Sequence, residues 1–313
     1  MLMYHRIISK EEAQRGVQAG MYVEPNTFDR HLRFLKKYFS IEPISEIFST
    51  SGRNIGLSGR KTRCVLTFDD GWYDFYTNCF PILKAHEVPA TVFLPTDFIG
   101  SKNSFWTDRL SFLLHRRFKQ RNAETLEASG QLTVKSPLVQ KLLTFRGSLE
   151  SRLESAIALL KTCSNEDIEK TITELSFLWG IEVIPPSRSF LSWDEVGDMG
   201  QTGLIHFGSH TATHRILTLL KQREVEEELR KSKETLIDRK AADPSFITFS
   251  FPNGNYNEEI CQMVKEAGYH LAVTTRKGWN HKEGNPFLLK RFPIHQDMTF
   301  TESMIGCRIA GLF

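Results

Sequence analysis

Short apolar runs alternate with longer amphipathic segments along most of the chain. These runs are rich in β-branched and aromatic residues, and they read LMYHRI (2–7), CVLTF (64–68), ATVFLP (90–95), LIHFGS (204–209), SFITFSF (245–251), HLAVTT (270–275) and FPI (292–294). Runs of this kind predict buried strands. The segments between these runs have apolar residues at helical spacing, and such alternation is typical of parallel strands joined by crossover helices. The pattern, roughly seven strand–helix units, predicts an α/β barrel, complete or incomplete.

The connecting helices are indicated by their spacing and their end signals. The pattern predicts helices at 27–39, 76–86, 223–239 and 257–268. The third carries charge pairs at i and i+4, and the fourth ends at Gly268, a residue type that commonly terminates helices.

One stretch interrupts the alternation. From about Phe105 to Arg188 no run predicts a strand, and amphipathic helices are expected at 104–121, 136–145, 149–163 and 165–180. We therefore expect one domain over 1–313 with a helical insertion at 102–188 on a βα loop. The insertion either adds packing over the barrel or acts as a lid that docks substrate, and both interpretations stay open.

Composition narrows the class of protein. Lys and Arg number 40 against 37 Asp and Glu, and a net charge of +3 is too small to indicate a nucleic-acid partner. No apolar run is long enough to span a membrane, and the N-terminus lacks a secretory signal, although peripheral membrane contact stays open. Five scattered cysteines without a C-x-x-C pair fit a reducing compartment. We expect a cytoplasmic protein.

Two adjacent acids follow the run CVLTF. Asp69 and Asp70 would repel each other and raise each other's pKa at a buried strand end, unless a cation lies nearby. Phe68 can anchor the strand below the barrel rim, where the acids lie. Gly71 lets the backbone turn sharply beside an ion. The pair therefore predicts a cation site.

Two histidines supply further candidate ligands. His210 and His214 are four residues apart, so one turn of helix would place both imidazoles on the same face, as two metal ligands require. Both follow the run LIHFGS, and in a parallel barrel the carboxyl ends of strands share one face. Either motif alone is common, but together they predict a metal bound by one carboxylate and two imidazoles.

The motifs resemble those of a known family. TFDDG (67–71), SHTATH (209–214), FSFPNG (249–254) and the opening LMYHRI resemble the polysaccharide deacetylases of carbohydrate esterase family 4, which have the NodB-homology fold. The resemblance covers nearly all of the chain outside the insertion. It implies a distorted or incomplete (β/α)7-type barrel. The implied activity is metal-dependent removal of N-acetyl groups from amino sugars in a glycan, a lipid-linked saccharide or a nucleotide-linked saccharide.

The resemblance also implies roles for the acids and histidines. Asp70, His210 and His214 would hold one divalent ion, with zinc expected first and cobalt, nickel or manganese as alternatives. Asp69 would stay free as the general base, since a metal lowers the pKa of water and a nearby carboxylate can take the proton.

An oxyanion donor is implied at Asn253, where the family uses a backbone N–H. The chain departs from the commonest pattern here, because Ser250 and Asn253 stand where an arginine and a tyrosine are usual. Arg291 could supply the missing guanidinium and keep Asp69 ionised. A rim salt bridge without a catalytic role is the alternative for Arg291.

Two histidines compete for the role of general acid. His5 matches a Y-H motif near the N-terminus of some exopolysaccharide deacetylases and is favoured, while His295 closes the last predicted strand. His206, within an apolar run, is expected to be a satisfied core histidine. Among the aromatics at strand ends or loops we expect one or two to stack on sugar, and the candidates are Trp72, Tyr73, Trp106 and Trp193, the last followed by Asp194 as a helix cap.

Other functions remain as alternatives. Relatives of the same fold hydrolyse small cyclic amides, so a non-sugar amide is one alternative substrate. A catalytically decayed glycan-binding protein is a second, although the intact acids and histidines count against it. A phosphoesterase is a third, but the sequence has no Gly-rich phosphate loop.

Overall fold

The computed structural model describes residues 1–313 except 15, 19, 49–60, 124–135, 184–187 and 282. The chain divides into two compact units. The barrel unit comprises Met1–Ser9, Gly20–Lys102 and Phe190–Phe313, and the helical unit comprises Lys10–Ala19 and Asn103–Ser189.

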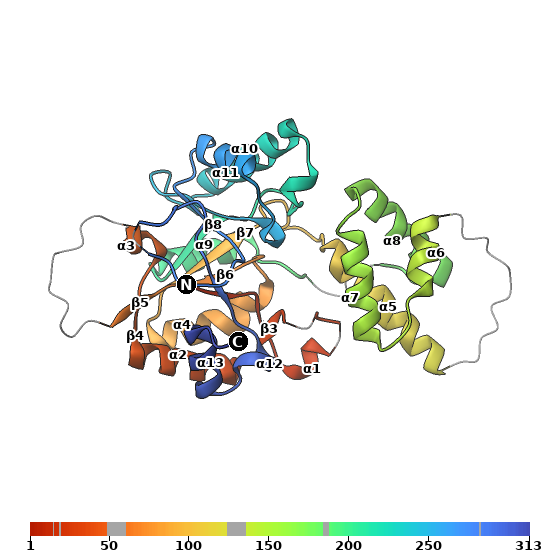
Figure 1. Ribbon diagram of the computed structural model, residues 1–313, viewed down its shortest axis with the longest axis horizontal. Coiled ribbons are helices and arrows are strands. Elements are labelled where there is room, and N and C mark those ends of the chain that lie inside the picture. Colours follow the sequence, from red (N-terminus) through yellow and green to blue (C-terminus); the bar gives the residue numbers. More distant parts are fainter. Residues whose placement is uncertain (15, 19, 49–60, 124–135, 184–187, 282) are drawn as a thin grey trace. The chain divides into compact units, whose positions relative to one another are not determined.

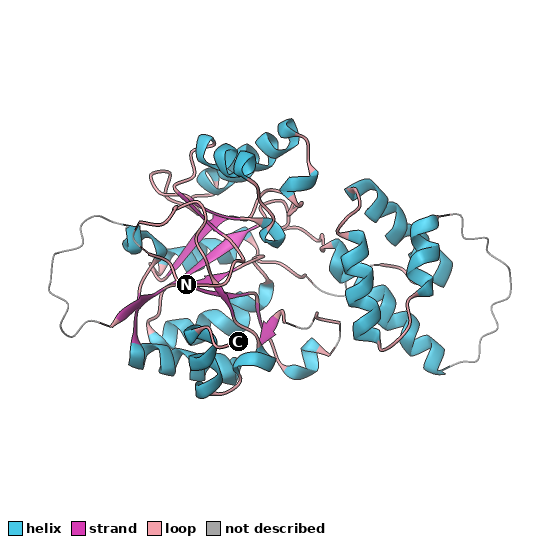
Figure 2. Cartoon of the chain, viewed as in Figure 1, coloured by secondary structure: helices cyan, strands magenta, loops and turns pink. Residues whose placement is uncertain are grey.

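A seven-stranded sheet forms the centre of the barrel unit (Figure 2). Its order is β10-β9-β8-β7-β6-β1-β11, and every neighbouring pair is parallel. The strands are β1 (Leu2–Tyr4), β6 (Leu66–Phe68), β7 (Ala90–Leu94), β8 (Ile205–Ser209), β9 (Thr248–Ser250), β10 (Leu271–Val273) and β11 (Phe292–Pro293). Two further parallel pairs join β2 (Arg6–Ile7) to β3 (Tyr22–Val23) and β4 (Phe39–Ile41) to β5 (Thr62–Cys64).

The sheet curls toward closure. The segment before β11 bonds to β10, because the Leu289 N–H donates to the carbonyl of Ala272 at 3.1 Å and the Thr274 N–H to that of Leu289 at 2.8 Å. A curled, parallel, seven-stranded sheet in a mixed α/β unit is the predicted incomplete (β/α)7-type barrel of the NodB class, so the fold prediction is confirmed.

Alternation along the strands separates the two faces of the sheet. Tyr4 and Phe68 stack at 5.1 Å between ring centroids, and both pack edge-on against Phe28 of α2 (Pro25–Tyr38). The residues next to them in sequence, including Thr67 and Asp69, therefore face the barrel interior.

Helices cover the outer face of the sheet (Figure 1). On one side, α10 (Gln222–Asp238) and α11 (Glu258–Glu266) bury Val225, Leu229 and Val264 in one cluster with Phe249 of β9. The remaining barrel-unit helices are α3 (Ile44–Phe48), a π-helical turn (Phe75–Cys79), α4 (Phe80–His86), α9 (Trp193–Gln201), a 3₁₀ turn (Leu217–Leu219), α10 (Gln222–Asp238), a second 3₁₀ turn (Pro252–Gly254), α11 (Glu258–Glu266), α12 (Gln296–Thr299) and α13 (Glu302–Ala310).

The helical unit has its own core. Its described elements are α1 (Lys10–Ala13), α5 (Trp106–Ala123), α6 (Pro137–Thr144), α7 (Leu149–Leu160) and α8 (Asn165–Trp179). Apolar stripes of α5 to α8 meet around Leu110, Leu153, Leu160 and Ile172. Serines cap three of these helices through a side-chain oxygen that accepts a backbone N–H, and they are Ser136, Ser148 and Ser164.

The unit corresponds to most of the predicted insertion at 102–188. All four expected helices are present, while residues 124–135 and 184–187 of the insertion lie outside the described residues. Lys10–Ala19 also belongs to this unit, which the strand and helix pattern does not anticipate. Among the described helices, none combines the length and apolar character needed to cross a membrane.

Candidate active site

The acid pair stands directly after β6. Asp69 continues the ladder to β1, since its N–H donates to the carbonyl of Tyr4 at 3.0 Å. Asp70 then adopts a left-handed conformation, with φ of 75°, and Gly71 follows at 63°. A Cβ on Gly71 would approach Leu94 Cδ2 to 2.7 Å, so glycine is required there for space as well as for backbone conformation. The tight turn directs the two neighbouring carboxylates to different partners.

Asp69 is paired with a buried guanidinium. Both terminal nitrogens of Arg291 lie 2.7 Å from the two Asp69 carboxylate oxygens, and the Arg291 side chain is fully buried. Burial acts to raise the pKa of Asp69, but the charge and hydrogen bonds of Arg291 outweigh it and lower that pKa below its usual value. Asp69 is therefore held ionised.

Arg291 is fully engaged. Its Nε donates to the carbonyl of Thr274 at 2.9 Å, and its terminal nitrogens also donate to the hydroxyls of Thr67 and Ser250, at 3.1 and 3.2 Å. Unlike the acids and histidines, Arg291 precedes its strand, β11, so it reaches the site from within the barrel. The contact expected between Arg291 and Asp69 is thus present in the structure, and a catalytic role for Arg291 stays a proposal.

Asp70 faces the two histidines. Its Oδ1 lies 3.5 Å from His210 Nε2 and 3.2 Å from His214 Nε2. The three candidate ligand atoms lie within 4.8 Å of one another. His210 donates its Nδ1–H to the carbonyl of Ser250 at 2.7 Å, and this bond orients the ring with Nε2 toward Asp70. Burial acts to raise the pKa of Asp70, but hydrogen bonds from both histidines lower it well below its usual value.

The histidines do not converge through a helix. Residues 210–214 form a loop after β8, with left-handed φ angles of 65° at Thr211 and 58° at His214. The prediction of a helical turn is therefore wrong, although the imidazoles do meet. Glu228 of α10 holds the loop, because its carboxylate accepts the N–H groups of Ala212 and Thr213 at 3.0 and 2.8 Å. The buried carboxylate thereby satisfies backbone N–H groups that the loop leaves without a backbone partner.

The donor set fits a divalent ion. Two imidazole Nε2 atoms and one carboxylate oxygen are ligands that zinc and its neighbours accept, and three protein ligands leave further positions open. The hydrogen bond from His210 to Ser250 provides the orienting partner that metal-bound histidines usually have. Asp70, His210 and His214 are therefore the residues that would hold such an ion.

Comparison with known proteins identifies the family. The model of the polysaccharide deacetylase family matches residues 57–137 and 143–272, which include both acids, both histidines and Asn253. The chain belongs to the polysaccharide deacetylase family. YxkH of Bacillus subtilis (strain 168), a protein assigned to the polysaccharide deacetylases, is 28% identical over 207 residues, covering 64% of this chain and 70% of YxkH.

Solved structures of similar fold include a further deacetylase. The deacetylase PplD of Streptococcus pyogenes, in complex with acetate, aligns over 97% of this chain and 95% of its own, with 21% identity and a TM-score of 0.59. IcaB from Ammonifex degensii aligns over 98% of this chain and 95% of its own, with 16% identity and a TM-score of 0.60. At these identities the likeness supports the fold.

Of the two candidate acids in this polysaccharide deacetylase, His5 lies near the acid pair. It stands between β1 and β2, and burial lowers its pKa while the carboxylates of Asp70 and Asp69 act to raise it. His295 instead directly precedes α12 and contacts Asp297 through Nδ1 at 2.7 Å. His5 therefore interacts electrostatically with both carboxylates, and its role as the general acid stays a prediction. Both histidines lie outside the residues matched by the deacetylase family model.

The expected oxyanion position has an unusual backbone. Asn253 lies in the 3₁₀ turn after β9 with a left-handed φ of 56°, and its exposed side chain donates to Asn255. The turn follows Ser250, whose carbonyl and hydroxyl contact His210 and Arg291. The donor role of the Asn253 N–H stays a prediction drawn from the deacetylase resemblance.

Two other expectations need correction. His206 is not a satisfied core histidine, because its buried Nε2 has no hydrogen-bond partner among the described residues, and it lines a cavity of about 830 Å³ at the start of β8. Helix α9 is capped by Ser192 rather than by Asp194, and the Ser192 side chain accepts the Glu195 N–H at 3.2 Å.

Trp193, one of the aromatics considered for sugar stacking, lies beneath a guanidinium, with Arg239 Cζ 5.3 Å from its ring centroid.

Sequence reasoning assigned no role to several supporting groups. Trp72, expected only as an aromatic that could stack on sugar, donates its indole N–H to Asp70. Glu228, which lies in a predicted helix with charge pairs at i and i+4, accepts two backbone N–H groups of the 210–214 loop. Only the closeness of Trp72 to Asp70 in sequence could have indicated a contact. Trp106 belongs to the helical unit and packs beside its core.

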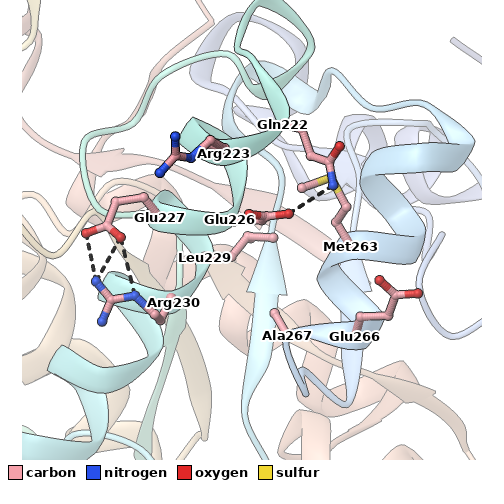
Figure 3. Close-up of a pocket in the computed structure, with 9 residues that line it drawn as sticks. All are labelled: Gln222, Arg223, Glu226, Glu227, Leu229, Arg230, Met263, Glu266 and Ala267. Atoms are coloured by element: carbon pink, nitrogen blue, oxygen red, sulfur yellow. Dashed lines mark hydrogen bonds and ion pairs between the residues drawn. The ribbon is translucent and has the colours of Figure 1, made fainter.

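A hollow of about 560 Å³ between α10 and α11 is separate from these ligands (Figure 3). Its charged groups are largely paired, since Arg230 contacts Glu227 and the Gln222 amide donates to Glu226 at 3.0 Å. It contains no histidine and lies on the outer helices. It is therefore not the deacetylase site.

Proposed function

We propose that the chain is a metal-dependent hydrolase that removes N-acetyl groups from amino sugars in a saccharide. The observation that carries this proposal is the division of the acid pair. Asp69 is held ionised by Arg291, while Asp70 faces two histidine nitrogens. An amide hydrolase needs these two groups side by side, a base and a cation site.

The residues divide the work as follows. A divalent ion held by Asp70, His210 and His214, most readily zinc, would polarise the amide carbonyl and lower the pKa of a water molecule. Asp69 takes the proton from the attacking water. A carboxylate has about four acceptor sites. Arg291 uses two of them and the Ser250 hydroxyl approaches a third at 3.5 Å, so Asp69 keeps capacity for one more donor.

His5 delivers a proton to the leaving nitrogen. Its lowered pKa makes the imidazolium a stronger acid, and the carboxylates of Asp70 and Asp69 favour the protonated form that must be present before the step. The Asn253 N–H would donate to the oxyanion.

The test is an acetate-release screen with matched variants. Purified protein is incubated with zinc, cobalt, nickel or manganese and with N-acetylated oligosaccharides, sugar nucleotides and small cyclic amides. We expect acetate from at least one N-acetylated saccharide with the wild type and none above background with Asp69→Asn. Turnover of cyclic amides alone would transfer the proposal to non-sugar amides. Absence of both metal binding and turnover would favour a glycan-binding protein.

A further inference from the structure

The unused oxygen of Asp70 has a dedicated partner. Trp72 donates its indole N–H to Asp70 Oδ2 at 3.0 Å, while Oδ1 faces the two histidines. Trp72 is only 4% exposed, so water does not readily compete for this bond. Because an indole N–H can only donate, it selects a carboxylate oxygen with a free lone pair and holds it. The bond therefore fixes which Asp70 oxygen points toward the metal site.

Two neighbouring side chains pack against the indole ring of Trp72. Its ring stacks on Phe190 with 4.9 Å between centroids and 19° between planes, and the guanidinium carbon of Arg6 lies 4.6 Å from the ring centroid. The backbone beside it is tied as well, since the Leu191 N–H donates to the carbonyl of Gly71 at 2.9 Å. These contacts restrict rotation of the indole and hence the direction of its N–H.

Asp74 fixes Arg6. Its Oδ2 accepts the Arg6 Nε–H at 2.8 Å, and its Oδ1 accepts the Ile7 N–H at 2.8 Å. The Asp74 side chain is 7% exposed. Arg6 directly follows His5, so one carboxylate on the acid-pair loop anchors the backbone next to the candidate acid and also the cation beside Trp72.

We propose that Asp74, Arg6 and Trp72 form a positioning chain that aims Asp70 Oδ1 at the metal site and fixes the strand end that carries His5. The inference rests on the proposed function. All three are positioning residues, because each acts through Asp70 or His5. Groups that orient metal-binding carboxylates by hydrogen bonds typically change metal affinity when removed.

Each link has a substitution that deletes one interaction. Trp72→Phe removes the N–H and keeps a ring against Phe190, leaving a buried carboxylate oxygen unpaired. We expect the dissociation constant for zinc to rise about 10-fold to 100-fold. Asp74→Asn removes the charge that holds Arg6 and should weaken zinc binding in the same direction but less, because the indole N–H remains.

The experiment titrates metal-free protein with zinc against a chromophoric chelator. Wild type, Trp72→Phe and Asp74→Asn are compared with Trp179→Phe, a tryptophan beside the core of the helical unit that should leave affinity unchanged. Thermal unfolding of each metal-free variant identifies proteins that fail to fold, and Trp72→Tyr provides a second ring-retaining variant that tests the same N–H. kcat and KM on the substrate found in the acetate screen give a second readout, and kcat should fall more than KM changes.

The outcomes separate this inference from the proposed function. Weaker zinc binding by folded Trp72→Phe and Trp72→Tyr, with Trp179→Phe unchanged, supports the positioning chain. Wild-type affinity and kcat in the folded Trp72 variants would overturn it while the proposed function stands. Failure of the wild type itself to bind zinc or another divalent ion would overturn both.

Discussion

The two units bury different kinds of side chain. In the described part of the barrel unit, the buried set includes charged and titratable groups, among them Asp69, Asp70, His210, Glu228 and Arg291. In the described part of the helical unit, the polar members of the buried set are Ser111 and Thr171, and the core is otherwise hydrocarbon.

This difference indicates where the chemistry lies. Burying a charge is costly unless a partner compensates it, so a fold keeps such groups where they serve a purpose or complete a network. The barrel unit compensates Asp69 with Arg291 and Asp70 with two histidines. In the described part of the helical unit no charged residue belongs to the buried set, and its burial is of the kind that stabilises packing. The predictions below compare equivalent changes in the two units.

The largest effect is expected from His5→Ala. Loss of one acid–base group should lower kcat by about 10² to 10⁴ and leave metal content unchanged. The matched control is His295→Ala, since His295 pairs with exposed Asp297 and should cost much less. If His295→Ala abolished activity while His5→Ala stayed near wild type, the late histidine would take the acid role. Steady-state kinetics and metal analysis decide between them.

Arg291→Gln should destabilise the barrel unit strongly. It leaves the Asp69 carboxylate buried without its counter-charge, which typically costs about 3 to 5 kcal/mol of unfolding free energy. Arg109→Gln is the control in the helical unit, because Arg109 pairs with Glu169, whose side chain is 43% exposed, and we expect about 1 kcal/mol or less there. Denaturant unfolding at neutral pH measures both, and equal losses would contradict the compensated-charge account.

Leu160→Ala should loosen the helical unit without affecting the metal site. Leu160 is fully buried, and truncation of such a leucine typically costs about 2 to 5 kcal/mol. Hydrogen exchange of α7 and α8 should report the loss, while zinc affinity stays at the wild-type value. Leu83→Ala in α4 is the counterpart, expected to loosen the barrel unit instead. A matching loss of zinc affinity in Leu160→Ala would show that the two units are energetically coupled.

The last prediction concerns the pH dependence of stability that His31 contributes. Burial lowers the pKa of His31 from 6.5 to about 4, and its ring contacts the Thr299 carbonyl through Nε2 at 2.6 Å. Between pH 4 and pH 6.5, the unfolded chain therefore binds a proton at His31 that the folded state does not bind. The stabilisation is fully present above pH 6.5 and falls as pH drops toward 4, by about 1.4 kcal/mol per pH unit. His31→Gln should flatten the dependence of the unfolding free energy on pH, as measured by hydrogen exchange in α2. An unchanged pH dependence would show that other groups cause it.

The strand pattern was sufficient to predict the barrel. All seven apolar runs contain strands of the central sheet, because buried parallel strands need β-branched and aromatic residues at nearly every position. The four helices of the insertion were also predictable from their apolar stripes. The membership of Lys10–Ala19 in the helical unit was not, since such a short polar segment has no periodic signal.

The candidate site was predictable only in part. Asp69, Asp70 and the two histidines carry motif spacing, and the absence of the usual arginine pointed to Arg291. The loop at 210–214 was not predictable, because its left-handed residues depend on Glu228, a distant side chain in an ordinary helical run. Contacts set by tertiary structure, such as Trp72 to Asp70, leave little trace in local sequence.

The central claim is that adjacent carboxylates, Asp69 and Asp70, have different roles. Metal content and acetate release in Asp69→Asn and Asp70→Asn test it most directly, because one isosteric change is made at two neighbouring positions. We expect Asp69→Asn to retain a wild-type complement of zinc and to lose activity, and Asp70→Asn to lose both. Equal zinc occupancy in the two variants, or zinc lost from Asp69→Asn alone, would contradict the account.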